Sequence, residues 1–339
     1  MRRIGNLYEK IISLDNLRLA DQKARKGKTN TYGVNKHDEN REQNIQKLHE
    51  QLKAGTFKTS EYEVFKIYEP KERDIYRLPY YPDRIVHHAV MNIMEPIWCS
   101  IFTEDTYSCI KGKGIHAAAK KLKKDLQTDP EGTRYCLKID IKKYYPSIDH
   151  DILKVIIRRK IKDKRLLALL DEIIDSAEGV PIGNYLSQYF ANLYLAYFDH
   201  WIKENKRVKY YYRYADDKVF LASTKEKLHQ LLSEIRKYLK INLKLTIKNN
   251  YQIFPVAARG IDFVGYVFFH THTLMRKSIK QNLCRKISRI NKRDTRPTSE
   301  EFKQEICSWW GWAKYCDSKH LINKLLKQSN YEIDFKRTA

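Results

Sequence analysis

The chain has 339 residues, of which 42% are apolar, so a real hydrophobic core can form and the composition argues against wholesale disorder. Its 65 Lys and Arg residues against 41 Asp and Glu give a net charge of +24, which favours a nucleic acid as partner over an acidic membrane surface. No apolar run approaches the roughly 20 residues that cross a bilayer, and no signal-peptide stretch follows the N-terminus, so we expect a cytoplasmic protein without membrane association.

The first part of the chain predicts helices and one β-hairpin. The expected helices are 5–25, 38–54, 83–100 and 115–127. The second of them should end at Gly55, because glycine is a common stop position. Two strand-like runs, 62–68 and 73–80, are separated by Glu-Pro-Lys-Glu, which indicates a hairpin with basic residues at its tip.

From residue 135 onward the pattern alternates between strands and helices. The expected strands are 135–141, the two halves of 208–223 on either side of Ala-Asp-Asp, about 243–254, and a strand pair within 261–276. The expected helices are 149–176, 185–204, a helix that ends at about 240, and 278–328. The order strand, helices, hairpin, helix, strand is typical of an α+β fold with a split βαβ sheet and helices on one side.

Acidic residues gather at two predicted strand ends. Asp140 lies at the end of one strand, and Asp216 and Asp217 are adjacent at a hairpin turn, where the alternation of side chains is relaxed. Carboxylates at close range repel one another unless cations neutralise them, and their oxygen atoms favour Mg²⁺. Two such ions about 3.5–4 Å apart would support phosphoryl transfer. An Asp-Asp pair alone is common in turns, so the second acidic strand end makes the prediction specific.

These residues resemble the motifs of reverse transcriptases. Tyr214-Ala-Asp-Asp217 is similar to the Tyr-x-Asp-Asp box, Asp140 to Tyr145 resembles the first palm motif, and the similarity runs in the family's order from about residue 60 to about 320. The resemblance implies an RNA-directed DNA polymerase with two Mg²⁺ ions, for which Mn²⁺ can substitute. It also implies a right-hand fold with fingers, a palm built on a split βαβ (ferredoxin-like) sheet, and a helical thumb. The implied domains are an N-terminal helical extension (1–60), fingers (61–134), palm (135–256, of which about 149–184 joins the fingers), and primer-grip hairpin with helical thumb (257–339).

The resemblance also assigns roles to individual residues. The implied catalytic residues are Asp140, Asp216, Asp217 and Lys248, and the implied metal-binding positions are Asp140, Ile141, Asp216 and Asp217. The implied positions around the incoming dNTP are Lys71, Arg73, Ile141, Tyr145, Ile182 and Gly183, and the implied primer grip comprises Phe263, Gly265 and Tyr266. Tyr145 would exclude a ribose 2′-hydroxyl, and Lys248 would protonate the pyrophosphate. The alternatives are core packing for Tyr145, a solvated hairpin tip for Lys71 and Arg73, and an exposed strand lysine for Lys248.

One motif departs from the common family pattern. Where the family usually has Gln-Gly-x-x-x-Ser-Pro, this chain has Ile182-Gly-Asn-Tyr-Leu-Ser-Gln188. This form resembles the reverse transcriptases of diversity-generating retroelements, as do Tyr68-Glu-Pro-Lys71 and Ser308-Trp-Trp-Gly311. The resemblance implies error-prone cDNA synthesis from a template-repeat RNA, with errors opposite adenine. Ile182 and Gln188 would set this fidelity, since Ile182 offers bulk in place of a hydrogen-bonding glutamine. Alternatively, Ile182 is a packing residue in a polymerase of ordinary fidelity.

The resemblance further implies partners. They are the template RNA and the RNA/cDNA heteroduplex, deoxynucleoside triphosphates, and a small, basic, oligomeric accessory variability protein in a bacterial or phage-encoded system. Two other readings remain open. One is a retron, group II intron-like or phage-defence reverse transcriptase of ordinary fidelity, and the other is a non-catalytic RNA-binding protein on a polymerase fold. The aromatic cluster Trp309, Trp310, Trp312 and Tyr315 is predicted to be core.

Overall fold

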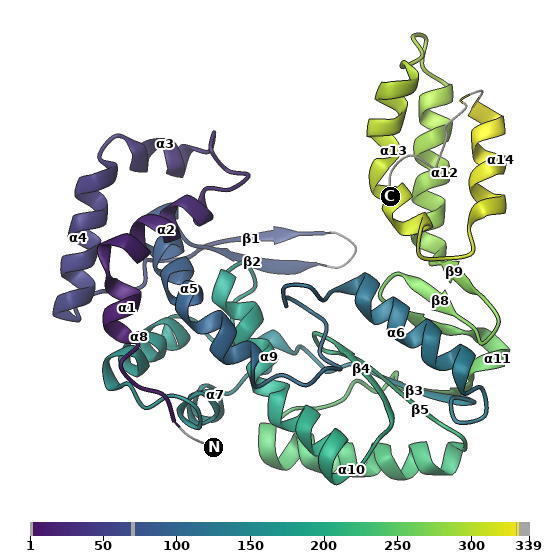
Figure 1. Cartoon of the computed structure of the whole chain (residues 1–339), viewed down its shortest axis with the longest axis horizontal. Helices are drawn as coiled ribbons and strands as arrows, with labels where there is room; N and C mark the ends of the chain where they lie inside the picture. Colours follow the sequence, from purple (N-terminus) through teal and green to yellow (C-terminus); the bar gives the residue numbers. More distant parts are fainter. Residues whose placement is uncertain (1–2, 69–71, 330, 332–339) are drawn as a thin grey trace. The chain divides into compact units, whose positions relative to one another are not determined.

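The computed structural model describes residues 3–68, 72–329 and 331. The chain forms two compact units, each built from segments that are distant in the sequence (Figure 1). The first unit comprises Met1–Cys109, Ile141–Arg207 and Glu234–Lys248. The second unit comprises Ile110–Asp140, Val208–Ser233 and Asn249–Ala339. Within the described residues, no helix is long and apolar enough to cross a membrane.

Helices dominate the N-terminal part of the first unit. They are α1 (Tyr8–Ile12), α2 (Leu14–Ala24), α3 (Tyr32–Asp38), α4 (Arg41–Ala54), the single turn η1 (Tyr80–Arg84) and α5 (Ile85–Cys99). The expected helix 5–25 is two helices, because Ser13 has extended backbone and its hydroxyl accepts a hydrogen bond from the Asn16 amide. Helix α3 was not predicted. Helix α4 ends at Gly55 as predicted, where the φ angle is +70°.

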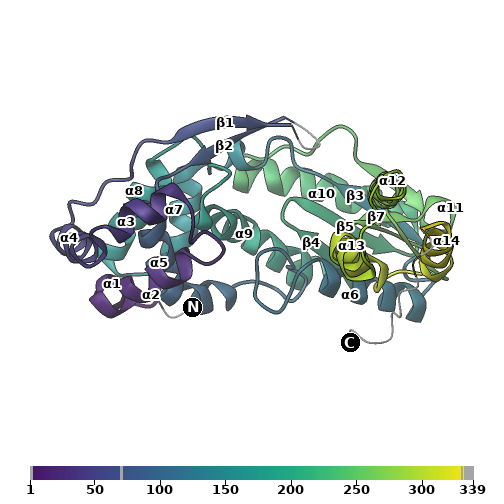
Figure 2. The same cartoon turned by 90° about the horizontal axis from the view of Figure 1, so that it is seen from above.

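A two-stranded hairpin extends from these helices as an arm (Figures 1 and 2). Strands β1 (Glu63–Ile67) and β2 (Arg73–Arg77) pair antiparallel, with Glu63 opposite Arg77 and Ile67 opposite Arg73. This confirms the predicted hairpin. The tip, which includes Lys71, lies outside the described residues.

The rest of the first unit packs around one buried helix. Its elements are η2 (Tyr145–Ser147), α7 (His150–Arg158), α8 (Lys164–Asp175), α9 (Tyr185–His200), η3 (Trp201–Asn205) and the second half of α10 (Lys225–Leu243). Helix α9 packs against both α5 and α7, and most of its side chains are buried. The helical stretch expected over 149–176 starts as predicted, with Asp149 as the cap of α7, but it is broken into two helices because the carboxylate of Asp163 caps a new one.

A four-stranded antiparallel sheet is the centre of the second unit. Its strands are β3 (Tyr135–Ile139), β4 (Tyr210–Tyr214), β5 (Asp217–Ala222) and β6 (Gln252–Pro255), in the order β4-β5-β3-β6. This order is that of a split βαβ sheet, as the sequence predicted. Helix α6 (Ile115–Thr128) packs against β4, and the Tyr212 hydroxyl donates a 2.5 Å hydrogen bond to Oδ2 of Asp125 in that helix.

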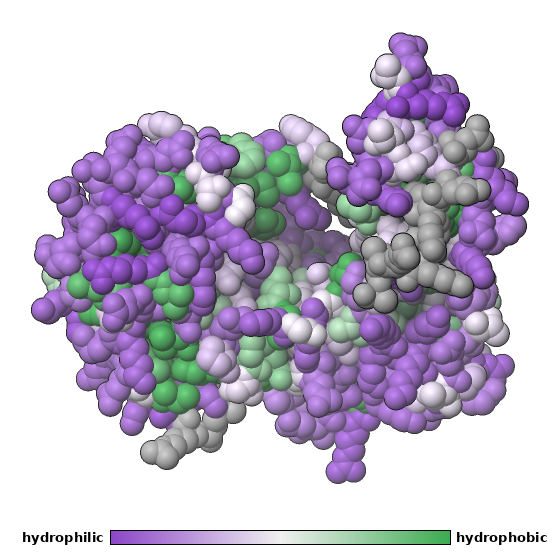
Figure 3. Space-filling model, turned by 45° about the horizontal axis from the view of Figure 1, so that its top comes forward, coloured by the Kyte–Doolittle hydropathy of each residue, from purple (hydrophilic) through white to green (hydrophobic). Residues whose placement is uncertain are grey.

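The C-terminal part of the second unit is a small sheet followed by three helices. These elements are α11 (Val256–Arg259), β7 (Ile261–Phe263), β8 (Tyr266–Phe268), β9 (Thr273–Met275), α12 (Lys277–Asn291), α13 (Ser299–Ala313) and α14 (Lys319–Ser329). The sheet has one strand more than the predicted pair. Helices α12–α14 run side by side and are seen almost end on in Figure 2. Trp309, Trp310 and Trp312 are partly buried against the bundle's apolar core, as predicted, while its outer surface is largely hydrophilic (Figure 3).

Candidate active site

Three aspartates meet at one end of the four-stranded sheet. The last residue pair between β3 and β5 is Ile139 with Lys218, so Asp140 leaves β3 opposite Asp217. Tyr214 pairs with Asp217 across the β4–β5 hairpin, which leaves Ala215 and Asp216 as the turn. The register of these strands therefore places Asp140, Asp216 and Asp217 together within the second unit.

Burial is the main influence on the electrostatics of this cluster. Burial, together with the hydrogen bond with Asp140, raises the pKa of Asp216 to about 6. Burial also raises the pKa of Asp217, although Nζ of Lys138 lies 3.4 Å from Oδ2 of Asp217 and opposes the change. The cluster thus retains protons more readily than isolated aspartates do.

Two buried cations hold the turn that carries the aspartates. Arg213 and Lys218 pair across the β4–β5 hairpin, and both are fully buried. Nη1 of Arg213 donates to the carbonyl of Ala215 at 3.2 Å, and Nζ of Lys218 donates to the carbonyl of Asp216 at 3.1 Å. The turn needs such support because Ala215 has a φ angle of +52°, which is unfavourable for a residue with a Cβ atom. Sequence reasoning missed both residues, although basic residues on both sides of the acidic box are a signal.

The donor set fits a hard divalent cation in its chemistry. Oδ1 of Asp217 is buried and has no hydrogen-bond partner among the described residues, so it is an acceptor that a cation would satisfy. A cation would also stabilise the ionised forms of Asp140 and Asp216, which repel each other here. In the part of the chain that the structure describes, no three His, Cys, Asp or Glu side chains are arranged as a ready metal site.

A second group of predicted site residues comes together in the first unit. The amide of Val180 donates a 3.0 Å hydrogen bond to the carbonyl of Tyr145, and the amide of Tyr76 in β2 donates a 2.8 Å bond to the carbonyl of Ile182. Gly183 has a φ angle of +128°, and a Cβ atom there would overlap the carbonyl oxygen of Tyr76. The loop between α8 and α9 thus ties Tyr145, Ile182 and Gly183 to the β1–β2 hairpin.

Hydrogen bonds between polar side chains also stabilise the loop between α8 and α9. Nδ2 of Asn184 donates to the hydroxyl of Tyr62 at 2.9 Å, and that hydroxyl lies 2.8 Å from Oγ of Ser176. Sequence reasoning did not single out Tyr62 or Ser176, since their contact joins segments more than 100 residues apart. The side chain of Ile182 is half-buried, whereas Gln188 is exposed on α9.

The remaining predicted residues of the first unit are less closely grouped. Tyr145 is half-buried, with its ring centroid 5.5 Å from that of Tyr144. Arg73 is exposed at the first position of β2. Ile141 is fully buried and forms an antiparallel bridge with Ile247, the residue before Lys248.

The predicted primer grip is a tight turn covered by a tryptophan of α13. The side chains of Phe263 and Tyr266 are fully buried, and the Tyr266 hydroxyl donates a 3.2 Å hydrogen bond to the carbonyl of Trp312. Gly265 lies between them with a φ angle of +89°, and a Cβ atom at this position would overlap the Trp312 ring. The ring of Trp312 therefore makes the close approach that Gly265 permits. The buried side chains of Phe263 and Tyr266 position the turn.

Comparisons with known proteins agree with this arrangement. The family model described as "Reverse transcriptase (RNA-dependent DNA polymerase)" matches residues 69–268, more than half of the chain. Protein YkfC of Escherichia coli (strain K12) is 27% identical over 294 residues, which cover 73% of this chain and 75% of that protein. The group II intron-encoded protein LtrA of Lactococcus lactis subsp. cremoris is 26% identical over 178 residues, which cover 49% of this chain and 29% of LtrA.

A solved structure supports the fold. The structure of apo telomerase from Candida tropicalis has a TM-score of 0.50 with this chain at 13% sequence identity. The match covers 81% of this chain and 60% of the telomerase chain. At this identity the similarity concerns the fold alone, and it is consistent with the right-hand polymerase architecture that the sequence predicted.

Proposed function

The chain belongs to the reverse transcriptase family, and we propose that it is an RNA-directed DNA polymerase. The observation that carries this proposal is the meeting of Asp140, Asp216 and Asp217 at the ends of β3 and β5, with raised pKa values at Asp216 and Asp217. A polymerase needs such a cluster, because phosphoryl transfer relies on carboxylates that hold divalent cations. The net charge of +24 fits a channel for a polyanionic duplex.

In this proposal each group has a defined task. Asp140, Asp216 and Asp217 would hold Mg²⁺, which would supply Lewis acidity for the attack of the primer 3′-hydroxyl and for the departure of pyrophosphate. The buried cations Arg213 and Lys218 fix the acidic turn, so that the carboxylates need little reorganisation. Lys248 gives a proton from Nζ to the leaving pyrophosphate.

We assign the nucleotide-side roles to residues of the first unit. The ring of Tyr145 bounds the sugar and excludes a 2′-hydroxyl, while Arg73 contacts the triphosphate. The hydrogen bond between the Tyr76 amide and the Ile182 carbonyl supports the assignment of Tyr145, because it holds the neighbouring loop in one conformation. We assign 61–134 to the fingers and 257–339 to the primer-grip hairpin and thumb.

We further propose that the enzyme is the error-prone reverse transcriptase of a diversity-generating retroelement. The support is the Ile182-to-Gln188 motif, together with the half-exposed side chain of Ile182 in a loop whose backbone is held by Tyr76. Such an exposed aliphatic group contacts a base pair without a directional hydrogen bond, so discrimination between bases decreases. The template in this proposal is a template-repeat RNA, and the further partner is a small basic accessory protein.

A second candidate is a group II intron-like reverse transcriptase of ordinary fidelity. The similarity to LtrA, which is a group II intron-encoded protein, favours it. The two candidates share the polymerase chemistry and differ in the error spectrum. A non-catalytic RNA-binding protein would not need the three aspartates, all of which are present.

Primer extension on a defined RNA template tests the proposal. Wild-type protein should make cDNA only with Mg²⁺ or Mn²⁺, and Asp217→Asn should lower the rate by about 10²–10⁴-fold because it removes a carboxylate from the cluster. The matched control is Asp294→Asn, which neutralises an exposed aspartate between α12 and α13. Sequencing the cDNA separates the two candidates: errors concentrated opposite adenine support the retroelement, and accurate copies support the second candidate. Equal activity of wild type and Asp217→Asn would refute the assignment of the site.

A further inference from the structure

A basic pocket lies in the first unit, apart from the residues assigned to the polymerase reaction. Its volume is about 770 Å³, and it is lined by the α2–α3 loop, α3, the base of the β1–β2 hairpin and η1. The cationic side chains of its lining are Lys28, Lys36, Arg77 and Arg84. The acidic ones are Glu39 and Glu63, so the lining has a net positive charge.

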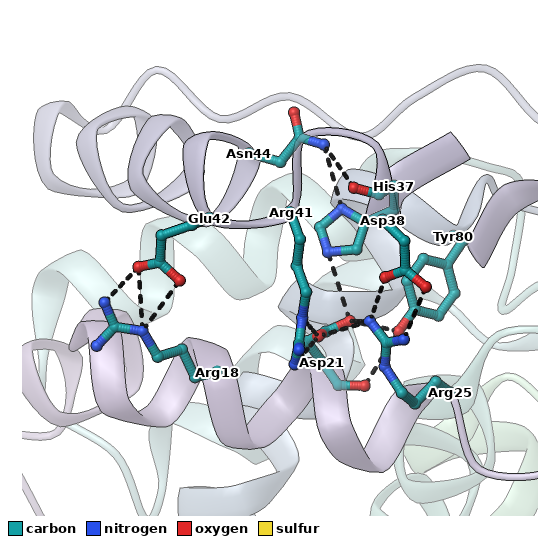
Figure 4. A network of polar contacts seen from close by, with 9 residues as sticks. All are labelled: Arg18, Asp21, Arg25, His37, Asp38, Arg41, Glu42, Asn44 and Tyr80. Atoms are coloured by element: carbon teal, nitrogen blue, oxygen red, sulfur yellow. Dashed lines mark hydrogen bonds and ion pairs between the residues drawn. The ribbon is translucent and has the colours of Figure 1, made fainter. Parts of the chain in front are cut away.

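A buried hydrogen-bond network fixes one wall of this pocket (Figure 4). The carboxylate of Asp21 is fully buried and is 2.9 Å from Nη2 of Arg25 and 2.6 Å from Nη2 of Arg41. It also accepts a 2.6 Å hydrogen bond from the hydroxyl of Tyr80, which lines the pocket. Since a buried carboxylate with several donors resists displacement, Tyr80 is held rigidly.

The neighbouring wall is aromatic. His37 of α3 stacks on Tyr81 of η1, with ring centroids 5.4 Å apart and planes at 20°. Gly33 allows α3 to approach η1, because a Cβ atom at this position would lie 3.0 Å from Cβ of Tyr80. These contacts define the shape of the pocket without any ligand.

Three cations of the lining, Lys28, Lys36 and Arg84, have no carboxylate partner among the described residues. Arg77 pairs with Glu63. By contrast, neither Lys28 nor Arg84 takes part in an ion pair among the described residues, and Nε of Arg84 is buried without a hydrogen-bond partner. The charge of Arg84 is the main reason why the pKa of Lys28 is lowered. Two half-buried cations that repel each other, one with an unsatisfied donor, form a site for an anion.

An exposed aromatic ring also lines the pocket, next to the cation of Lys36. Tyr32 lines the pocket with 79% of its surface exposed, and Nζ of Lys36 lies 6.0 Å from its ring centroid. An exposed tyrosine beside cations offers a nucleobase a surface for stacking while the cations contact the phosphate.

We propose that this pocket binds one nucleotide of a single-stranded RNA, with its phosphate between Lys28 and Arg84 and its base against Tyr32. The inference rests on the proposed function, because that function makes RNA the natural polyanion of this protein. Arg77 links the pocket to the loop that contains Ile182. It lines the pocket and directly follows Tyr76, whose amide donates a hydrogen bond to the carbonyl of Ile182. RNA in the pocket therefore contacts the strand that positions Ile182.

The proposal is tested by equilibrium binding of a fluorescein-labelled single-stranded RNA to the 339-residue chain. Binding is measured by fluorescence anisotropy over a range of salt concentrations, without dNTPs. Lys28→Gln and Arg84→Gln should each weaken binding about three- to tenfold, and should lower the slope of log affinity against log salt by about 1. The matched control is Lys26→Gln, which removes the same charge from an exposed lysine outside the pocket lining. Tyr32→Ala should weaken binding without changing the salt slope, because stacking releases no counterion.

Three results would overturn the proposal. Lys26→Gln could weaken binding as much as Lys28→Gln does, which would mean that only general charge matters. Lys28→Gln and Arg84→Gln could bind RNA as tightly as wild type does. With unchanged thermal unfolding midpoints, this result would mean that neither cation contacts the RNA. Adenosine monophosphate or inorganic phosphate could displace the RNA at a concentration as low as that at which the RNA itself binds. The natural ligand of the pocket would then be a free anion and not an RNA. Binding does not require synthesis, so failure of primer extension and failure of this test are separate results.

Discussion

The amide of Tyr76 in β2 donates a 2.8 Å hydrogen bond to the carbonyl oxygen of Ile182 in the loop before α9. Residues more than 100 positions apart are thereby joined through their backbones. Because Tyr76 belongs to β2, this hydrogen bond links the loop to the β1–β2 hairpin. Any change that separates them should alter how the loop presents its side chains.

Gly183→Ala is expected to separate the loop from the hairpin. The φ angle of +128° disfavours alanine, and the new Cβ atom would overlap the carbonyl oxygen of Tyr76. We expect a loss of about 1–3 kcal/mol in the free energy of unfolding, measured by urea denaturation, and a higher KM for dNTPs. Gly114→Ala is the control, because Gly114 has a φ angle of +135° but open space around it. Equal effects of the two substitutions would show that backbone strain alone is responsible.

Ile182→Gln should change the error spectrum while it leaves the fold intact. The backbone of Ile182 is held by Tyr76, whereas its side chain is half-exposed, so a glutamine fits without moving the loop. A side-chain amide near the base pair adds a directional contact, and we expect errors opposite adenine to fall several-fold, or about 1 kcal/mol in discrimination. Ile182→Leu keeps the apolar bulk and should keep the spectrum, as measured by sequencing the cDNA. An unchanged spectrum in Ile182→Gln would remove this residue from the account of fidelity.

Tyr145→Ala should admit ribonucleotides. The carbonyl of Tyr145 accepts the bond from Val180 whatever its side chain is, so the substitution removes the ring and leaves the loop attached. Without the ring, the preference for dNTPs over rNTPs, taken as the ratio of their kcat/KM values, should fall at least about tenfold. Tyr145→Phe retains the ring and should retain the preference. If the alanine variant discriminates like wild type, the ring is a packing residue.

Gly265→Ala should detach α13 from the turn between β7 and β8. The added Cβ atom would overlap the Trp312 ring, and the φ angle of +89° adds backbone strain. We expect a lower thermal unfolding midpoint and shorter products per binding event, measured in primer extension with a trap for released enzyme. Gly311→Ala is a matched control one residue from Trp312, because Gly311 is helical and has no atoms within 4 Å of the added Cβ. It should stabilise the helix by about 0.5–1 kcal/mol. Products of wild-type length from Gly265→Ala would contradict this role.

Stability should decrease in mild acid because of His88. Burial lowers the pKa of His88 to about 4, and its ring stacks on Tyr185 with centroids 4.3 Å apart. Between about pH 6.5 and pH 4 the unfolded chain binds a proton at this residue and the folded chain does not, so the free energy of unfolding falls as pH falls through this window. The loss at about pH 5 should be about 1 kcal/mol after allowance for partial exposure.

His88→Phe keeps the stacking partner of Tyr185 and removes the titrating group. Urea unfolding at about pH 5 and about pH 7.5 should then show a smaller difference than in wild type. The contribution of His87, whose pKa burial lowers to about 3, would remain. An equal pH difference in both proteins would assign the acid sensitivity to other groups.

The sequence alone predicted most elements and the acidic end of the sheet, because these depend on local patterns. The hairpin of β1 and β2, helix α6, the two strands around the Asp-Asp pair and the stop at Gly55 are all present. It failed where a single polar side chain ends one helix and begins another. Ser13 and Asp163 each cap a helix within a stretch that was expected to be one helix, and a periodic pattern of apolar residues runs through such breaks unchanged.

The motifs in the sequence grouped Asp140 with Asp216 and Asp217, and the β3–β5 register is the physical reason why they meet. Other contacts between distant residues were decided by the tertiary structure alone. No local pattern predicts that Tyr76 holds Ile182, that Trp312 covers Gly265, or that Lys28 and Arg84 share a pocket. The physical reason is that periodicity and propensity act over a few neighbouring residues. Pairings between distant segments depend instead on how whole elements pack, which sets the register, the burial and the charge around each side chain.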